Sequence, residues 1–96
     1  MPISHLNGES RACGATTVVV GQNFVKVDGN LWAVAGDPDT DGEGALINSQ
    51  SFVTINGIPV ILQGDNAAAD SLCIPVGGAH CDPYATGGDP LVTVNV

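Results

Sequence analysis

Three cysteines and two histidines are the residues of this 96-residue chain best suited to chemistry. These candidate ligands are His5, Cys13, Cys73, His80 and Cys81. Thiolate sulfur and imidazole nitrogen are the donors that tetrahedral zinc and iron sites use, and four of the five would complete one site. We therefore expect a metal site drawn from this set, with zinc as the first candidate and iron as the second.

The densest group of candidate ligands lies in the segment SLCIPVGGAHCDP, which contains Cys73, His80 and Cys81. The glycine pair Gly77-Gly78 lets this loop fold back, so that Cys73 and His80 can meet at one ion. A Cys73–Cys81 disulfide is an alternative, favoured if the mature protein works outside the cell. In a third interpretation the cysteines are small buried apolar residues and the histidines are exposed loop residues.

A catalytic interpretation of the same segment is also available. Cys81 next to His80 and Asp82 superficially offers a nucleophile, a base and an orienting group. Neighbours on a strand or tight loop do not normally point at one another, and no oxyanion-hole or phosphate-cradling motif accompanies them. We therefore expect that the protein is not an enzyme.

A second loop, DPDTDGEG at residues 37–44, is acidic and has no cysteine or histidine. Its alternating acidic residues are Asp37, Asp39, Asp41 and Glu43. Spaced carboxylates suit calcium, but the twelve-residue spacing of an EF-hand is missing. We expect a solvated acidic loop in preference to a calcium site.

Composition excludes several classes of partner. Two basic residues against ten acidic ones give a formal charge of -8, which repels nucleic acid and anionic lipid head groups.

No apolar run approaches the roughly 20 residues of a membrane span, and the amino terminus lacks the features of a secretory signal. We expect one domain over residues 1–96, made in the cytoplasm without a signal peptide.

The apolar residues alternate in short runs, which predicts strands and an all-β fold. Two hairpins are expected, because Asp28-Gly29 and Asn56-Gly57 are dipeptides that two-residue type I′ turns prefer. The segment Asn66 to Ser71 could form one helical turn, because an asparagine there stands next to three alanines.

The two hairpins form an internal repeat, NFVKVDGNLWAVAGD at residues 23–37 and SFVTINGIPVILQGD at residues 51–65. A third partial copy, Leu91 to Asn95, repeats only the first strand of the unit. This pattern suits three pseudo-threefold arms around a narrow core. The residues expected to face that core are Val25, Val27, Trp32, Val34, Val53, Ile55, Val60 and Leu62.

The second copy, from Val53 to Val60 and ending in Gly64-Asp65, follows the pattern V-x-V-x-G-x-P-V-x-x-x-G-D, with Ile55 at the second valine position. In this respect the chain resembles the PAAR-repeat family, and the likeness runs roughly from Cys13 to the terminus. The first copy has Leu31 at the proline position, and the Pro-Ala-Ala-Arg tetrapeptide is absent. The resemblance implies a small cone of β-hairpins whose apex is closed by a metal ion.

The same resemblance implies ligands and a role. Cys13 matches the position where the family's first loop often provides a ligand, and Cys73 to Cys81 resembles a stretched form of its Cys-Pro-x-His-Gly loop. The implied role is a monomeric tip whose base caps the trimeric β-helical spike of a phage tail or type VI secretion system. Located at the tip of the virion or secreted apparatus, it would contact the target membrane transiently. The alternative function is a free-standing adaptor module that binds a metal or calcium.

Overall fold

Short strands make up the regular structure of this chain. The computed structural model describes residues 2–94. Its elements are β1 (Ile3–Ser4), β2 (Lys26–Val27), β3 (Asn30–Leu31), β4 (Thr54–Ile55), β5 (Ile58–Pro59), the 3-10 turn η1 (Gly78–Cys81) and β6 (Asp89–Thr93). Over this described range the chain forms no α-helix, and no helix is long and apolar enough to span a membrane. The β-rich character expected from the sequence is confirmed.

Two of the three sheets are the predicted hairpins, β2–β3 and β4–β5, both antiparallel. Asp28 and Gly29 have φ values of 53° and 84°, and Asn56 and Gly57 have values of 53° and 82°. Positive φ at both central residues defines the type I′ turn. The turns therefore confirm the prediction and fix the register, in which Val27 faces Asn30.

The third sheet joins the two ends of the chain. Strand β1 pairs antiparallel with β6, with Ile3 opposite Thr93 and Ser4 opposite Asp89, so the register shifts between the two pairs. The predicted terminal strand is therefore present in β6, although its last predicted residue, Asn95, lies outside the described residues.

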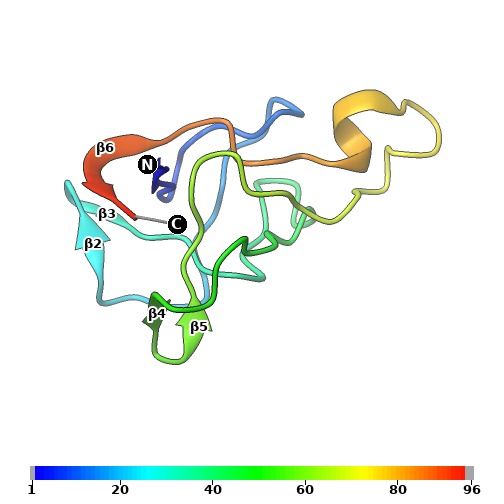
Figure 1. Ribbon diagram of the computed structural model, residues 1–96. Helices are drawn as coiled ribbons and strands as arrows, with labels where there is room; N and C mark the ends of the chain where they lie inside the picture. The colour runs from blue at the N-terminus through cyan, green and yellow to red at the C-terminus, as the bar shows by residue number, and fades with distance from the viewer. Residues whose placement is uncertain (1, 95–96) are drawn as a thin grey trace.

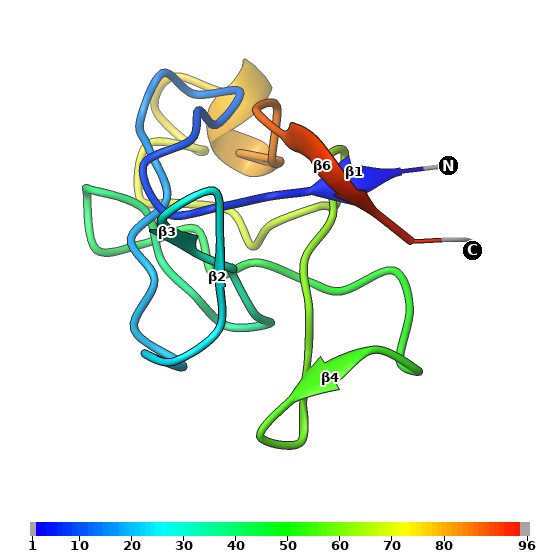
Figure 2. The ribbon, with the colours of Figure 1, turned by 90° about the vertical axis from the view of Figure 1, so that its left-hand side faces the viewer.

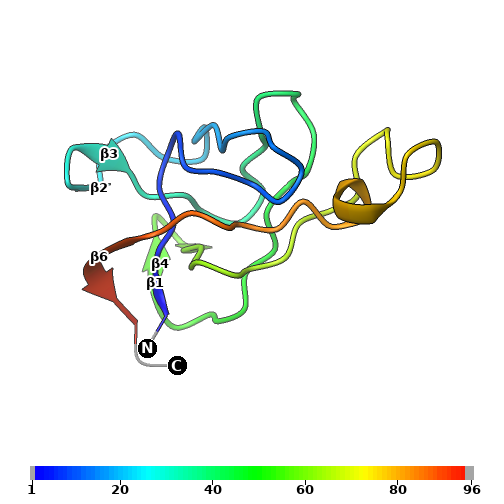
Figure 3. The ribbon, with the colours of Figure 1, turned by 90° about the horizontal axis from the view of Figure 1, so that it is seen from above.

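The three sheets gather toward one end of an elongated molecule with extents of 36 × 24 × 22 Å. Figures 1 and 3 show η1 at the opposite end, with the connecting loops between. Seen toward the sheet end, β1–β6, β2–β3 and β4 lie around a common centre (Figure 2). The fold thus separates a sheet end from a loop end.

A closed ring of backbone hydrogen bonds relates the three arms. The amide of Ala33 donates to the carbonyl of His5 (3.0 Å), Ile61 donates to Ala33 (2.9 Å), and His5 donates to Ile61 (3.2 Å). These residues follow one another at intervals of 28 in the sequence. A second set with the same interval consists of Asn7 to Leu31, Ala35 to Pro59 and Gln63 to Ile3, at 2.8, 2.9 and 2.8 Å. The arms therefore repeat around one axis.

Acidic side chains close the same turn in each arm. Glu9, Asp37 and Asp65 each accept a hydrogen bond from the backbone amide three residues earlier, at 2.7, 2.9 and 2.9 Å. Residues 3–9, ISHLNGE, are therefore the structural counterpart of LWAVAGD and PVILQGD. The third arm is complete, since β6 supplies its first strand and the amino terminus supplies its second.

The arms bury a shared apolar core. Its members are Leu6, Val27, Trp32, Val34, Ile55, Val60, Leu62 and Val94, with Val25, Val53, Ile58 and Val92 packed against them. Every residue expected to face inward is in this set. The Trp32 indole also donates to the carbonyl of Ile61 (2.9 Å), so its polar group is satisfied inside the core.

The helical turn expected at Asn66 to Ser71 is wrong. The amide of Asp70 donates to the carbonyl of His80 (2.9 Å), and the amide of Ser71 donates to the Glu43 carboxylate (2.7 Å). These long-range bonds take the amides that a helical turn would need. The only helical element in residues 2–94 is η1, which lies farther along the chain.

Candidate metal centre

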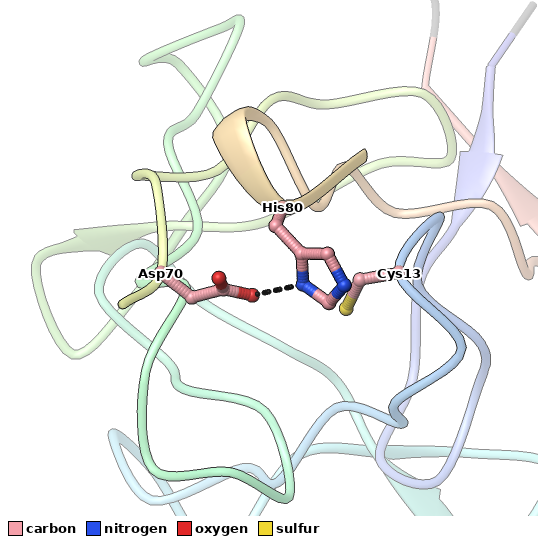
Figure 4. A group of neighbouring side chains, drawn as sticks. All are labelled: Cys13, Asp70 and His80. Atoms are coloured by element: carbon pink, nitrogen blue, oxygen red, sulfur yellow. Dashed lines mark hydrogen bonds and ion pairs between the residues drawn. The ribbon is translucent and has the colours of Figure 1, made fainter. Parts of the chain in front are cut away.

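Three side chains that can ligate a metal converge at the loop end. Ligand atoms of Cys13, Asp70 and His80 all lie within 4.8 Å of one another. Figure 4 shows Asp70 and Cys13 on opposite sides of the His80 imidazole. Two of the three, Cys13 and His80, belong to the set predicted from the sequence.

Backbone hydrogen bonds hold the three segments together. Cys13 sits in a tight turn in which the Gly14 amide donates to Arg11 (3.0 Å). Gly14 has a φ of 92°, a left-handed conformation that glycine adopts without strain. The amide of Asp70 donates to the carbonyl of His80 (2.9 Å), which ties the two non-cysteine members of the group to each other.

The Asp70 carboxylate is buried and hydrogen-bonded on both oxygens. Oδ2 lies 2.9 Å from Nδ1 of His80, and Oδ1 accepts from the Leu72 amide (2.9 Å). The hydrogen bond from His80 lowers the pKa of Asp70, the bond from Leu72 adds to this effect, and burial opposes it. Asp70 therefore offers an ionised carboxylate beside the imidazole.

Asp70 was not among the residues predicted from the sequence. It lies in the stretch for which a helical turn was expected, and nothing in that stretch marks it as a ligand. The available signal is its place three residues before Cys73, at the start of the loop that carries His80.

Cys73 and Cys81 were predicted as ligands, but the structure joins them in a disulfide with a Cα–Cα distance of 4.5 Å. This is the alternative that the sequence left open. A disulfide sulfur is not a thiolate, so neither residue is available as a thiolate ligand in this state. The bond instead closes the loop of residues 73–81, which carries His80.

His5 was also predicted as a ligand, but it lies outside this group. Its side chain is fully buried, with Nδ1 2.8 Å from the Gly87 carbonyl and Nε2 2.6 Å from Oγ1 of Thr17. Because a carbonyl only accepts, Nδ1 is the protonated nitrogen and Nε2 accepts from the hydroxyl. Burial lowers the pKa of His5 from its ordinary 6.5. His5 therefore serves as a neutral core residue.

Arg11, two residues before Cys13, is buried. Its guanidinium donates to the carbonyls of Gly44 (2.7 Å), Pro83 (3.2 Å) and Asp37 (3.1 Å). A fourth bond runs from Nε to Oγ1 of Thr17 (2.6 Å). The side chain therefore joins loops from all three arms and supports the turn that presents Cys13.

The loop of residues 37–44 is only in part the solvated acidic loop that we expected, since Asp41 is exposed. Asp37 and Asp39 are buried. Asp37 accepts from the amides of Val20 and Gly21 (3.1 and 2.8 Å), and Asp39 accepts from the amide of Asp41 (3.0 Å). These carboxylates are used to fix the backbone, which explains why they are removed from water.

Glu43, in the same loop, reaches the candidate metal centre indirectly. Its two carboxylate oxygens accept from the amide (2.7 Å) and the hydroxyl (2.9 Å) of Ser71, the residue after Asp70. Asp39 approaches Cys13, with 3.9 Å between Oδ2 and Sγ. The second arm therefore supports the group without supplying a sulfur or nitrogen ligand.

One sulfur, one nitrogen and one carboxylate oxygen form a mixed donor set. Such a set suits a borderline metal ion in tetrahedral geometry, with three protein ligands and one open position. Ligand atoms around a tetrahedral zinc ion lie roughly 3.3–3.7 Å apart, given bond lengths of about 2.0–2.3 Å. The 4.8 Å limit on this group exceeds that separation by about 1 Å, a change that side-chain rotation can supply.

Comparison with known proteins yields no family assignment: no family model matches the chain, and no curated protein is similar to it in sequence.

Proposed function

We propose that this chain is a PAAR-like tip protein that caps the trimeric β-helical spike of a contractile injection system. The observation that carries the proposal is the ring of hydrogen bonds among His5, Ala33 and Ile61. One chain with three like arms can meet each subunit of a trimer in the same way. A partner without threefold symmetry could not contact all three arms in the same way, so it would not make use of this repetition.

The division of the molecule into two ends also supports the proposal. The sheet end offers strands from all three arms, and the loop end carries η1 (Figure 1). In a spike tip the sheet end is the base that meets the spike, and the loop end leads into the target envelope. Contact with the target membrane is then transient, and the role of the protein is mechanical.

The metal ion in this proposal is zinc, with iron as the second candidate. Cys13, Asp70 and His80 would hold it, and a water molecule or a further ligand would take the fourth position. Cys13 lies far in the sequence from Asp70 and His80, so one ion would join two distant segments at the loop end. In small sites of this kind, metal binding free energy contributes directly to folding free energy.

The Cys73–Cys81 disulfide is compatible with a tip that acts outside the cell. Disulfides persist in oxidising surroundings such as virion surfaces and secreted assemblies, and they are rare in the cytoplasm. The protein would therefore be made with free thiols and acquire this bond when exposed.

Co-expression with the trimeric β-helical spike protein encoded in the same genome tests the function. The expected product is a stable complex of one chain with three spike subunits, measured by native mass spectrometry. A chain that stays monomeric beside the folded spike trimer would overturn the proposal and favour a free-standing adaptor module.

A further inference from the structure

Three exposed apolar side chains occupy equivalent positions in the three arms. Phe24, Phe52 and Leu91 have exposed fractions of 61%, 66% and 68%. The chain contains only two phenylalanines, so both are on the surface. Scattered apolar surface residues are ordinary, but the recurrence of large ones at one position of a structural repeat calls for a partner.

In each arm, the backbone amide of the exposed apolar residue donates to a side-chain oxygen. The side-chain oxygen of Gln22 accepts from the Phe24 amide (2.9 Å), and that of Gln50 accepts from the Phe52 amide (3.0 Å). In the third arm, Oδ1 of Asp89 accepts from the Leu91 amide (2.8 Å). The acceptor always lies two residues before the apolar residue. Gln22 and Gln50 also accept from the next amide and donate to two backbone carbonyls, so the two phenylalanine backbones are fixed alike before any partner binds.

The three side chains are exposed, whereas the residues that follow them pack inward. The residues that follow them, Val25, Val53 and Val92, pack against the core. Leu91 lies within β6, and Phe24 and Phe52 lie in bends that lead directly into β2 and β4. The outward position is therefore built into each arm.

The surroundings of the three side chains carry little charge, although the whole chain has a formal charge of -8. Residues 51–59 contain no charged residue, residues 23–31 contain Lys26 and Asp28, and residues 89–94 contain Asp89. Most of the acidic residues lie elsewhere in the chain. This near-neutral setting favours contact with an apolar protein surface, since few charges must lose water on docking.

We propose that Phe24, Phe52 and Leu91 are three equivalent anchors through which one copy of this chain docks on three identical apolar sites of a threefold-symmetric protein trimer. This inference rests on the proposed function and assigns the contact residues on the chain. The threefold recurrence argues for a trimer, because a partner with a single site would engage one anchor and leave two exposed. A lipid surface would impose no such symmetry.

The test measures binding of serine variants to the spike trimer encoded in the same genome. Phe24→Ser, Phe52→Ser and Leu91→Ser are made singly and together, and dissociation constants are measured by biolayer interferometry. Each single variant should weaken binding by roughly tenfold, and the triple variant should abolish it. Val76→Ser is the matched control, because Val76 is 65% exposed in the disulfide loop near η1.

The outcomes separate this inference from the proposed function. All three substitutions lie at exposed side chains, so thermal unfolding should show variants as stable as the parent. If the parent binds the trimer and the triple variant binds equally well, the three residues are not anchors, and the spike-tip function still stands. A loss confined to one position would equally overturn the threefold assignment. A parent chain that ignores the trimer would overturn both proposals.

Discussion

Nδ1 of His80 lies 2.9 Å from Oδ2 of Asp70, a residue ten positions earlier in the chain. If the ring donates through Nδ1, its Nε2 atom is left with a free electron pair, and Figure 4 shows Cys13 on that side of the imidazole. A carboxylate that orients a histidine in this way is a frequent feature of protein metal sites. Asp70 therefore has two uses, as a ligand itself or as the group that orients His80.

Asp70→Asn should weaken zinc binding by about 10- to 100-fold, because either use requires the carboxylate. A chelator competition titration on the purified protein measures the affinity. Asp41→Asn is the matched control, since Asp41 is exposed and lies outside the group. Equal affinity in Asp70→Asn and the parent would remove Asp70 from the site, and zinc absent from the parent itself would remove the site.

Cys73→Ser together with Cys81→Ser should lower the free energy of unfolding by about 2–3 kcal/mol, because the bond closes a short loop in the unfolded chain. Urea denaturation measures the change. Alkylation of the folded, unreduced parent should label Cys13 alone, the one free cysteine in the structure. Labelling of all three cysteines without a reductant would show that the disulfide does not form.

Protein stability should fall as the pH drops below about 6.5, because folding holds His5 neutral. Burial lowers the pKa of His5 from 6.5, so the unfolded chain binds more protons just below that value. The contribution of neutral His5 to protein stability is therefore complete above pH 6.5 and is lost as the pH falls toward the pKa of His5 in the folded state. Near the His5 imidazole, the charge of Arg11 opposes protonation of His5 and the charge of Asp65 favours it. Oε1 of Glu9 lies 3.9 Å from Nδ1 of His5.

Melting temperatures of the parent, His5→Ala and His80→Ala between pH 5 and pH 8 check this assignment. The pH dependence should flatten in His5→Ala, whose alanine matches Ala33 at the equivalent position of the first arm. It should persist in His80→Ala. The reverse pattern would assign the dependence to His80 and contradict the prediction.

Arg11→Ala should cost about 2–4 kcal/mol of unfolding free energy, because four buried acceptors each lose one donor together. Chemical denaturation measures the loss. Lys26→Ala is the control among the two basic residues of the chain, since Lys26 is exposed and should change stability by less than about 0.5 kcal/mol. A similar small effect for Arg11→Ala would mean that the loops hold without the guanidinium.

Much of the fold follows from local chemistry that the sequence displays directly. Asp28-Gly29 and Asn56-Gly57 specify tight turns through their own backbone preferences, and alternation around them selects which side chains are buried. The third arm could be predicted only in part, because its second strand lies at the other end of the chain. Pairing Ile3 with Thr93 is a long-range event that no local pattern encodes.

The candidate site, like the fold, could be predicted from the sequence only in part. Cysteine and histidine visibly cluster near residues 73–81 of the sequence, and Cys13 could be recognised there as a further donor. Three further features depend on how the chain folds: His5 is enclosed by the core, Cys73 pairs with Cys81, and Asp70 lies beside His80. The physical reason is that side-chain type gives ligand capacity, whereas proximity depends on how three arms close around one axis.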